Sequence, residues 1–153
     1  MIHQLFILKS QLFLNNKFAP TYHNIGNAFL SLEMYDSALV YLQKAISLDS
    51  NFHQAYRDIA LTYHALTRYN EAIPNFLKAI RLEPTKGKVY FELACSYAMS
   101  NQPEQAINFL TQAYARGYKN KEALLTDPDL ESLKNIKTFQ DLLDKYLPDW
   151  RNR

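Results

Sequence analysis

The side chains that could carry out chemistry in this sequence are four histidines and one cysteine, and their spacing does not indicate a catalytic site. His3, His23, His53 and His64 show neither the metalloprotease spacing nor that of a paired metal ligand. Cys95 would need a positioned base to act as a nucleophile, and His64 is the candidate. The three glycines form no phosphate-binding loop. We therefore predict no enzyme activity, no metal and no cofactor.

The composition indicates one ordinary domain. A chain of 153 residues buries roughly 70% of the surface that it exposes when unfolded. The formal net charge is +2, and the charged residues are intermixed without a basic stripe, so we expect no nucleic acid partner. The single cysteine, Cys95, excludes an intrachain disulfide and favours a reducing compartment, so we predict a cytoplasmic location.

One set of residue types returns every 34 positions between Tyr22 and Ala113. Aromatic, branched aliphatic, small and bulky apolar residues each keep this interval over three units. The seven sets are Tyr22, Tyr56 and Tyr90; Ile25, Ile59 and Leu93; Gly26, Ala60 and Ala94; Phe29, Tyr63 and Tyr97; Ala38, Ala72 and Ala106; Leu42, Phe76 and Leu110; and Ala45, Ala79 and Ala113. Packing that repeats along the chain explains such a ladder, so we interpret these positions as core.

This order of residues resembles the tetratricopeptide repeat (TPR), whose period is 34 residues. Pro84 ends a unit as in the family pattern, while Ser50 and Tyr118 stand at that place in the other two units. The resemblance covers residues 19–118 and implies an all-α fold, a right-handed TPR superhelix that is an α-solenoid of antiparallel helix pairs. We expect units at 19–52, 53–86 and 87–118.

Each unit reads as two helices. In the second unit the apolar residues of each half return at the spacing of one helical stripe, and the alanines and Gly26 let two helices approach to the short end of the usual range of about 8–10 Å. Asp36 and Asn70 are suitable N-caps for second helices. Pro103 suits the first turn of another, and Gly117 suits the end of the last.

Residues 1–18 read as a degenerate half-repeat. Counting back by 34 places Leu5 and Leu8 beside Leu39 and Leu42, but Gln4 and Gln11 stand where two alanines are expected. One broad helical face, interrupted by Lys9, carries the apolar residues Ile2, Leu5, Phe6, Leu8, Leu12 and Phe13.

Three interpretations of this segment remain open. It is a helix that caps the first unit, or a self-association helix that forms a homodimer and covers its exposed apolar residues. The third interpretation, a targeting segment or membrane anchor, is disfavoured because the stretch lacks a basic start and a small-residue cleavage site and is too short to span a bilayer. We expect no membrane partner.

Residues 119–153 lie outside the period and are predicted to cap the array. Lys121 to Leu125 suits a short helical turn, and Asp127 with Pro128 suits the start of another helix. The stripe from Phe139 to Leu147 predicts a last helix, which Pro148 ends. This tail resembles the one that closes many bacterial TPR proteins, and it hides the apolar side of the last unit. An alternative is that it lies in the groove as a self-ligand.

The resemblance implies a concave groove lined by the first helix of each unit. In the family, fixed positions of these helices face inward and contact a partner. Here they are His23, Asn27, Leu30 and Ser31; Gln54, Arg57, Asp58, Leu61 and His64; and Lys88, Phe91, Glu92, Cys95 and Met99.

The best-known use of the groove is a carboxylate clamp for acidic C-terminal tails of chaperones. The matching residues here are His23, Asn27, Asp58, Lys88 and Glu92, and two of them are carboxylates that would repel an anion. We therefore predict a different ligand, an extended or helical peptide. We expect Arg57 and Lys88 to anchor an acidic group, unless Arg57 pairs internally with Asp58 or Glu92.

The predicted function is that of an adaptor that binds a protein or peptide segment in the groove. One alternative is a structural homo-oligomer that assembles through residues 1–14 or by end-to-end stacking. Another is a small chaperone for a secreted or assembling partner.

Overall fold

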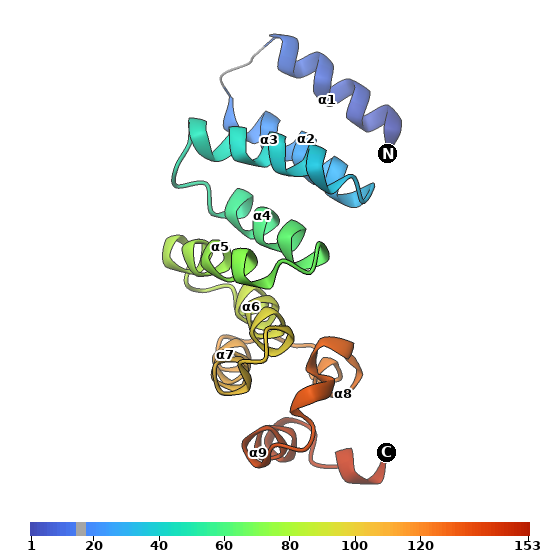
Figure 1. Ribbon diagram of the computed structural model, residues 1–153, viewed down its shortest axis with the longest axis vertical. Helices are drawn as coiled ribbons and strands as arrows, with labels where there is room; N and C mark the ends of the chain where they lie inside the picture. The colour runs from blue at the N-terminus through green and yellow to red at the C-terminus, as the bar shows by residue number, and fades with distance from the viewer. Residues whose placement is uncertain (15–17) are drawn as a thin grey trace. The chain divides into compact units, whose positions relative to one another are not determined.

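The computed structural model describes residues 1–14 and 18–153, and the regular elements in these ranges are all helices (Figure 1). The predicted all-α fold class is confirmed. The side chains of residues 11–14 are not among the described parts, so the predictions for Gln11, Leu12 and Phe13 are not tested. The part of the predicted N-terminal cap at 15–17 also lies outside the described residues. Two compact units make up the chain, Met1–Pro84 and Thr85–Arg153.

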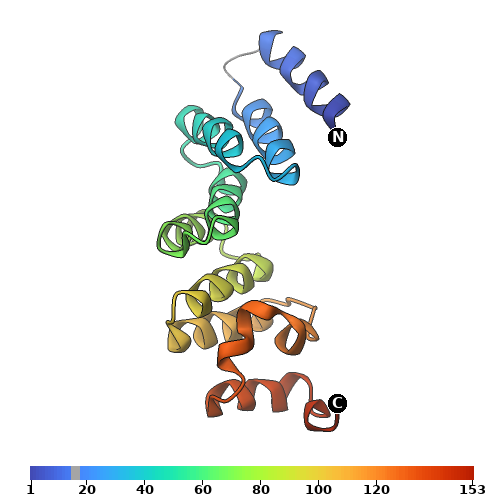
Figure 2. The same ribbon diagram turned by 45° about the vertical axis from the view of Figure 1, so that its right-hand side comes forward.

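The first unit consists of stacked helix hairpins. It contains α1 (Ile2–Leu14), α2 (Ala19–Ser31), α3 (Tyr35–Leu48), α4 (His53–Ala65) and α5 (Tyr69–Leu82). Helices α2 and α3 form one hairpin, α4 and α5 form the next, and α1 packs on α2 (Figure 2). The core holds the branched and aromatic members of the repeat, among them Ile25, Phe29, Leu42 and Ile59.

Small residues of the repeat are buried, and one of them, Gly26, lies where the two helices of a hairpin approach closely. Ala38, Ala45 and Ala72 are completely buried. At Gly26 of α2, an added Cβ would lie 2.6 Å from Cγ of Leu42 in α3, well inside the contact distance of two carbon atoms. A larger residue at Gly26 therefore requires Leu42 to move.

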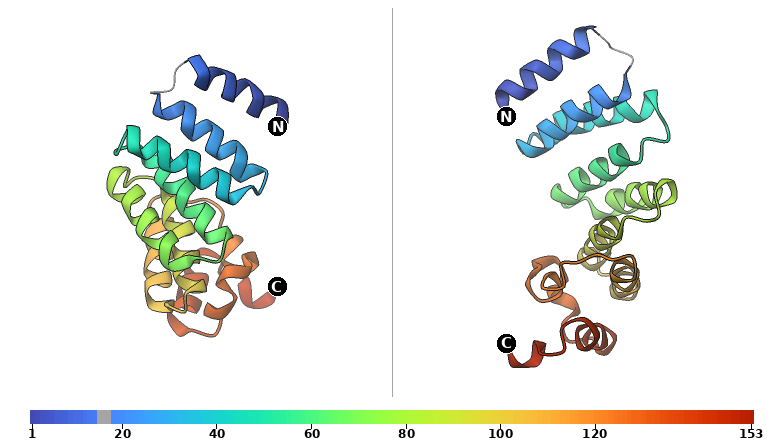
Figure 3. Two further views of the ribbon diagram at one scale, coloured as in Figure 1. Left: turned by 45° about the horizontal axis from the view of Figure 1, so that its top comes forward. Right: turned by 180° about the vertical axis from the view of Figure 1, so that it is seen from behind.

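The second unit is one hairpin with a C-terminal cover. Helices α6 (Gly87–Met99) and α7 (Pro103–Ala115) pair as before. The cover consists of α8 (Ala123–Thr126), the 3₁₀-helix η1 (Pro128–Leu133), α9 (Lys137–Tyr146) and the 3₁₀-helix η2 (Trp150–Asn152). Helix η1 lies against α6, and α9 lies against α7 (Figure 3). Five completely buried residues of the cover close this core: Leu124, Leu130, Leu133, Phe139 and Leu143.

The same turn joins the two helices of each hairpin. Its residue in the left-handed region is Glu33, Thr67 or Asn101, with φ of 57°, 57° and 58°, and these residues stand 34 apart. In the first turn, the amide of Met34 donates to the carbonyl of Phe29, and that of Glu33 donates to Leu30. This is a Schellman motif, which satisfies the last carbonyl groups of the first helix.

This turn explains why two predicted N-caps are wrong. The residue after the left-handed one, Met34 or Arg68, is the N-cap of the second helix, so α3 begins at Tyr35 and α5 at Tyr69. Asp36 and Asn70 are therefore the second residues of their helices and not caps. The predicted roles of Pro103, at the first position of α7, and of Gly117, with φ of 80° after α7, are confirmed.

The predicted N-cap at Asp127 is also confirmed. The side chain of Asp127 accepts a hydrogen bond from the amide of Asp129 at 3.0 Å, and Pro128 is the first residue of η1. The turn predicted at Lys121–Leu125 corresponds to α8, which begins two residues later and ends one residue later, at Ala123–Thr126. Helix α9 ends at Tyr146, before Pro148, as the stripe predicts.

The face of α1 that packs against the first hairpin is narrower than the sequence predicts. Leu5 and Leu8 pack against the core of the first hairpin, and the ammonium group of Lys9 lies 5.2 Å from the ring centre of Phe29. Ile2 and Phe6 are exposed, so they do not share the buried face. Within residues 1–14 and 18–153, no helix has both the length and the apolar character that crossing a bilayer requires.

Replacing Ala72 with leucine tests the close helix crossing. Ala72 is completely buried, so we expect the larger side chain to lower the free energy of unfolding by about 1–3 kcal/mol through overpacking. Ala65→Leu, at an exposed position of α4, is the matched control and should have little effect. Urea denaturation measures both. Equal midpoints for the two variants would contradict the crossing.

Exchanging the residues of the left-handed position tests the shared turn. A β-branched residue is strained there, whereas asparagine tolerates it. Thr67→Asn should raise the free energy of unfolding by roughly 1 kcal/mol, and Asn101→Thr should lower it by a similar amount. Opposite shifts of the denaturation midpoint are the expected result. Shifts in the same direction would contradict a common turn geometry.

Candidate functional site

A buried carboxylate joins the first helices of the first two hairpins. Asp58 of α4 is only 3% exposed. Its Oδ2 accepts hydrogen bonds from Nε2 of His23 at 2.7 Å and from Nδ2 of Asn27 at 3.2 Å, both from α2. A carboxylate accepts but does not donate, so the His23 tautomer in this contact carries its proton on Nε2. These contacts hold α2 and α4 side by side.

This contact corrects the sequence prediction for Asp58. The side chain was expected to face a partner, but it is buried and bound within the first unit. His23, which also lies 4.8 Å from the ring of Phe52, is half-buried for the same reason. The hydroxyl of Thr62 donates to the carbonyl of Asp58 at 2.7 Å. A polar residue at an inward-facing position can therefore serve the packing of adjacent units instead of a ligand.

Arg57 pairs with Asp58, which is one of the two internal partners that the sequence left open. Its Nη1 lies 3.4 Å from Oδ1 of Asp58, and the side chain is 28% exposed. The guanidinium group is therefore already close to a carboxylate. Its predicted role as an anchor for an acidic ligand remains a prediction.

The remaining predicted residues of α2 and α4 form a partly exposed face. Gln54, Arg57, Leu61 and His64 follow one helical stripe of α4. Asn27 and Leu30 of α2 are the counterparts of Leu61 and His64, 34 residues earlier. We call these six residues the first-helix face. Asn27 and Gln54 are exposed, and the other four are half-buried.

The C-terminal cover lies on residues of α6 that were predicted to meet a partner. Phe91 and Cys95 are each 5% exposed. The ring of Phe91 lies 4.7 Å from that of Tyr118, and Cys95 lies near Asp127 and Asp129 at the start of η1. The prediction that these two side chains are exposed is wrong, because the chain itself occupies that side of α6. The contact of η1 with α6 accounts for this burial, and the interpretation of the tail as a self-ligand in the groove stays a prediction.

The other predicted residues of α6 are less covered. Lys88 and Met99 are exposed, and Glu92 is half-buried. Ser31, at the end of α2, is exposed and donates its hydroxyl to the carbonyl of Asn27. The third hairpin therefore offers fewer of its predicted residues to a partner than α2 and α4 do.

Cys95 is held as a neutral thiol. Burial raises the pKa of Cys95 well above its ordinary value, and the nearby charges of Asp127 and Asp129 raise it further. A thiol in this environment is a poor nucleophile, because the thiolate is the reactive form. The sulfur atom and one oxygen of each aspartate lie within 4.8 Å of one another. The sequence predicted Asp127 as an N-cap, but it did not predict that this residue lies near Cys95 of α6.

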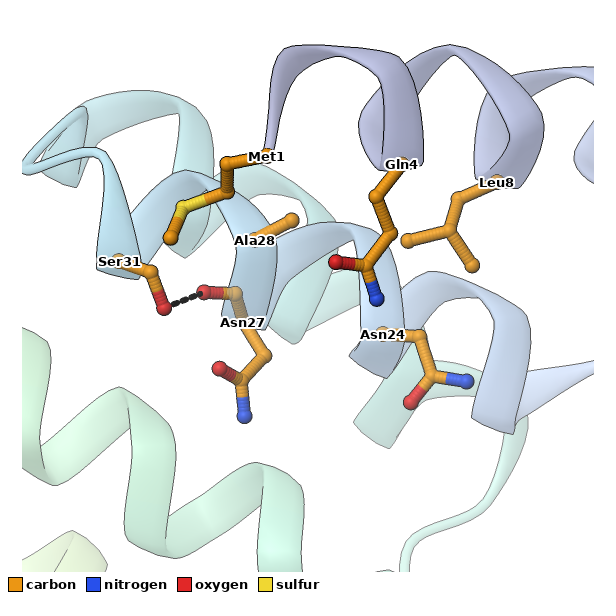
Figure 4. Close-up of a pocket in the computed structure, with 7 residues that line it drawn as sticks. All are labelled: Met1, Gln4, Leu8, Asn24, Asn27, Ala28 and Ser31. Carbon is orange, nitrogen blue, oxygen red and sulfur yellow. Dashed lines mark hydrogen bonds between the residues drawn. The ribbon is translucent and has the colours of Figure 1, made fainter.

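A pocket lies beside α1, and the sequence did not predict it. Its volume is about 190 Å³, and it is lined by residues of α1 and α2: Met1, Gln4, Leu8, Asn24, Asn27, Ala28 and Ser31 (Figure 4). Gln4 extends its amide group from α1 toward α2, whereas the amide of Asn27 donates to Asp58 of α4. The count of 34 places Leu8, which lines this pocket, at the position of Leu42 in α3.

Tandem helix hairpins with a 34-residue period define this chain as a helical repeat scaffold. Models of the tetratricopeptide repeat match residues 19–52, 53–86 and 75–108, and the chain belongs to this family. The third match overlaps the second and is out of step with the predicted unit at 87–118, so the predicted boundaries remain a prediction. The comparison with curated proteins gives no match.

Solved TPR structures share this fold. "Crystal structure of YrrB: a TPR protein with an unusual peptide-binding site" matches with a TM-score of 0.76 and 26% identity, over 94% of this chain and 71% of that one. "MamA RS-1 ArsTM double mutant" matches with a TM-score of 0.80 and 18% identity, over 97% and 84%. "Crystal structure of MamA" matches with a TM-score of 0.69 and 23% identity, over 73% of this chain and 66% of that one. The α-solenoid class is confirmed.

Removing the buried carboxylate tests how α2 and α4 are joined. Asp58→Ala leaves His23 and Asn27 without their acceptor, so we expect the free energy of unfolding to fall by about 1–3 kcal/mol. Asp58→Asn keeps one acceptor oxygen and should lose less. Asp36→Ala, which removes an exposed carboxylate of α3, is the control. Urea denaturation compares the three. A loss for Asp58→Ala no larger than that of the control would contradict the proposed junction.

Proposed function

We propose that this chain is an adaptor that binds a segment of another protein on the first-helix face. Membership of the TPR family and the resemblance to YrrB, whose structure is described as having a peptide-binding site, support a protein-interaction scaffold. The observation that carries the finer proposal is the contrast within α2 and α4. Most positions of α2 and α4 that keep the 34-residue pattern are buried, although Tyr22, Tyr56 and Tyr63 are half-buried. The first-helix face varies between units, and its residues are exposed or half-buried.

The chemistry of this face suits a short amphipathic segment. Leu30 and Leu61 offer apolar surface, and the exposed amide of Gln54 can bond to the backbone of an extended peptide. Because Arg57 already lies beside Asp58, its charge is partly neutralised. We therefore expect apolar contact to contribute more affinity than charge pairing does.

A carboxylate clamp is not proposed. His23 and Asn27 are hydrogen-bonded to the buried carboxylate of Asp58. Two residues at clamp positions therefore already contact an acidic group of the chain itself. An acidic tail would have to displace or approach this carboxylate, which is unfavourable. The ligand we propose is accordingly not an acidic C-terminus.

A phage-displayed peptide library, selected on the full chain, supplies the probes for this proposal. Peptides that bind should lose at least tenfold in affinity for Leu61→Asp, which places a charge in the apolar part of the face. Val40→Asp, on α3, is the matched control because Val40 is 64% exposed outside this face. Isothermal calorimetry measures both, and circular dichroism confirms that each variant is folded.

Two results would reject the proposal. One is a library that yields no specific binder to the full chain. The other is a set of binders that Val40→Asp weakens as much as Leu61→Asp does, because the binding surface would then lie elsewhere.

A further inference from the structure

Exposed basic residues lie where the start of α6 meets the end of α7, within the second unit. At Gly87 of α6, an added Cβ would lie 2.6 Å from the carbonyl oxygen of Ala113 and 3.1 Å from the amide nitrogen of Tyr118. The two chain segments are therefore in contact, and each contributes two cations. We call these four residues the basic junction: Lys86, Lys88, Arg116 and Lys119.

The repeat itself does not require charge at these positions. Counting back by 34 gives Phe52, Gln54, Leu82 and Thr85, and counting back by twice that interval gives Phe18, Pro20, Leu48 and Asn51. All of these counterparts are uncharged. Moreover, Gly117 stands where the first two hairpins have Asp49 and Glu83. The packing of a hairpin therefore does not explain the basic junction.

The lysines of the basic junction have no carboxylate partner among the described residues. Residues 85–91 and 113–121 include no acidic residue, and Glu92, one turn after Lys88, is half-buried. Several other cations of the second unit are paired. Lys134 pairs with Glu131, Lys137 with Asp141, Arg151 with Asp144, and Arg153 with Glu122 and Asp149.

Two of the four charges are placed unfavourably for their own helix. Lys86 is the N-cap of α6 and Lys88 is its second residue, and no side chain accepts a hydrogen bond from the amides at this end. A helix N-terminus carries a partial positive charge, which repels cations and attracts anions. An anion that approaches the basic junction therefore reduces this repulsion and meets lysines that are not already paired.

The surroundings of the basic junction favour an acidic protein segment over other anions. Binding of single-stranded nucleic acid uses exposed rings, but Tyr90 is 3% exposed beneath Arg116, and Tyr118 is half-buried against Phe91. Membrane binding uses exposed apolar side chains beside the cations. Within residues 85–121, the exposed large apolar side chain is Met99, at the other end of α6.

We propose that the basic junction binds an acidic segment of a partner protein, whose carboxylates contact the lysines at the start of α6. This surface belongs to the second unit, whereas the first-helix face belongs to the first unit, so the proposal does not depend on the ligand of that face. The sequence placed Lys88 at a partner-facing position. It did not predict the other three residues, because the fold brings them together from separate parts of the chain.

Fluorescence anisotropy of a labelled peptide of alternating aspartate and glutamate residues, titrated with the full chain, tests this proposal. The peptide should bind, and its affinity should fall as the NaCl concentration rises. Lys86→Glu and Lys119→Glu should each weaken binding by roughly tenfold or more, because each replaces an attraction with a repulsion. Lys44→Glu makes the same change of net charge at an exposed position of α3. This matched control should alter the affinity by less than about twofold, because distant exposed charges are screened.

Lys86→Gln separates binding from folding. It removes a cation from a helix N-terminus, so the thermal denaturation midpoint should stay unchanged or rise while the acidic peptide binds more weakly. A lower midpoint would contradict the unfavourable placement of this charge, on which the proposal relies.

Three results of the binding experiment would overturn the proposal. The first is no binding of the acidic peptide at low salt. The second is an equal loss of affinity for Lys44→Glu and Lys119→Glu, because net charge and not the basic junction would then determine binding. The third is tighter binding of single-stranded oligothymidylate or of phosphatidylserine vesicles than of the acidic peptide, because the partner would then be a nucleic acid or a membrane.

Discussion

The close approach of two helices at small side chains is the constraint on which this structure depends. At Gly26 the space beside α2 is already occupied by Leu42, and Ala38, Ala45 and Ala72 are buried completely. Small residues at these points allow the aromatic and branched residues beside them to close the core. Once these positions are fixed, the first helices keep a stripe that packing does not determine, and that stripe is where a partner can be recognised.

Polar contacts then specify how one hairpin lies on the next. The carboxylate of Asp58 is buried between α2 and α4 and accepts from His23 and Asn27. A buried charge of this kind is tolerated only when its hydrogen bonds are satisfied. The residues that look suited to bind an anion are thus used within the protein. In the first hairpin, Asn24 occupies the position of Asp58 and is exposed.

The fold could be predicted from the sequence because the packing repeats with the chain. Each core position appears three times, so chance agreement is small, and the ends of α7 and η1 follow from Pro103, Gly117 and Asp127. The N-caps could not be predicted in this way. A Schellman turn with Glu33 or Thr67 in the left-handed region has no glycine to mark it.

The candidate site was less predictable, because it depends on parts that do not repeat. The burial of Phe91 and Cys95 comes from the tail after Gly117, whose sequence indicates a cap but not the side of α6 that it covers. The burial of Asp58 depends on the pairing of His23 with a residue 35 positions away. The pocket beside α1 depends on which face of α1 meets α2, and Leu5, Leu8 and Lys9 lie on that face.

Hydrogen–deuterium exchange of the full chain, with and without a peptide selected from a library, tests the central claim most directly. The account predicts that the bound peptide slows exchange in α2 and α4, whose first-helix face it covers. Slower exchange confined to α3 and α5 would place the ligand on the second helices and contradict the account.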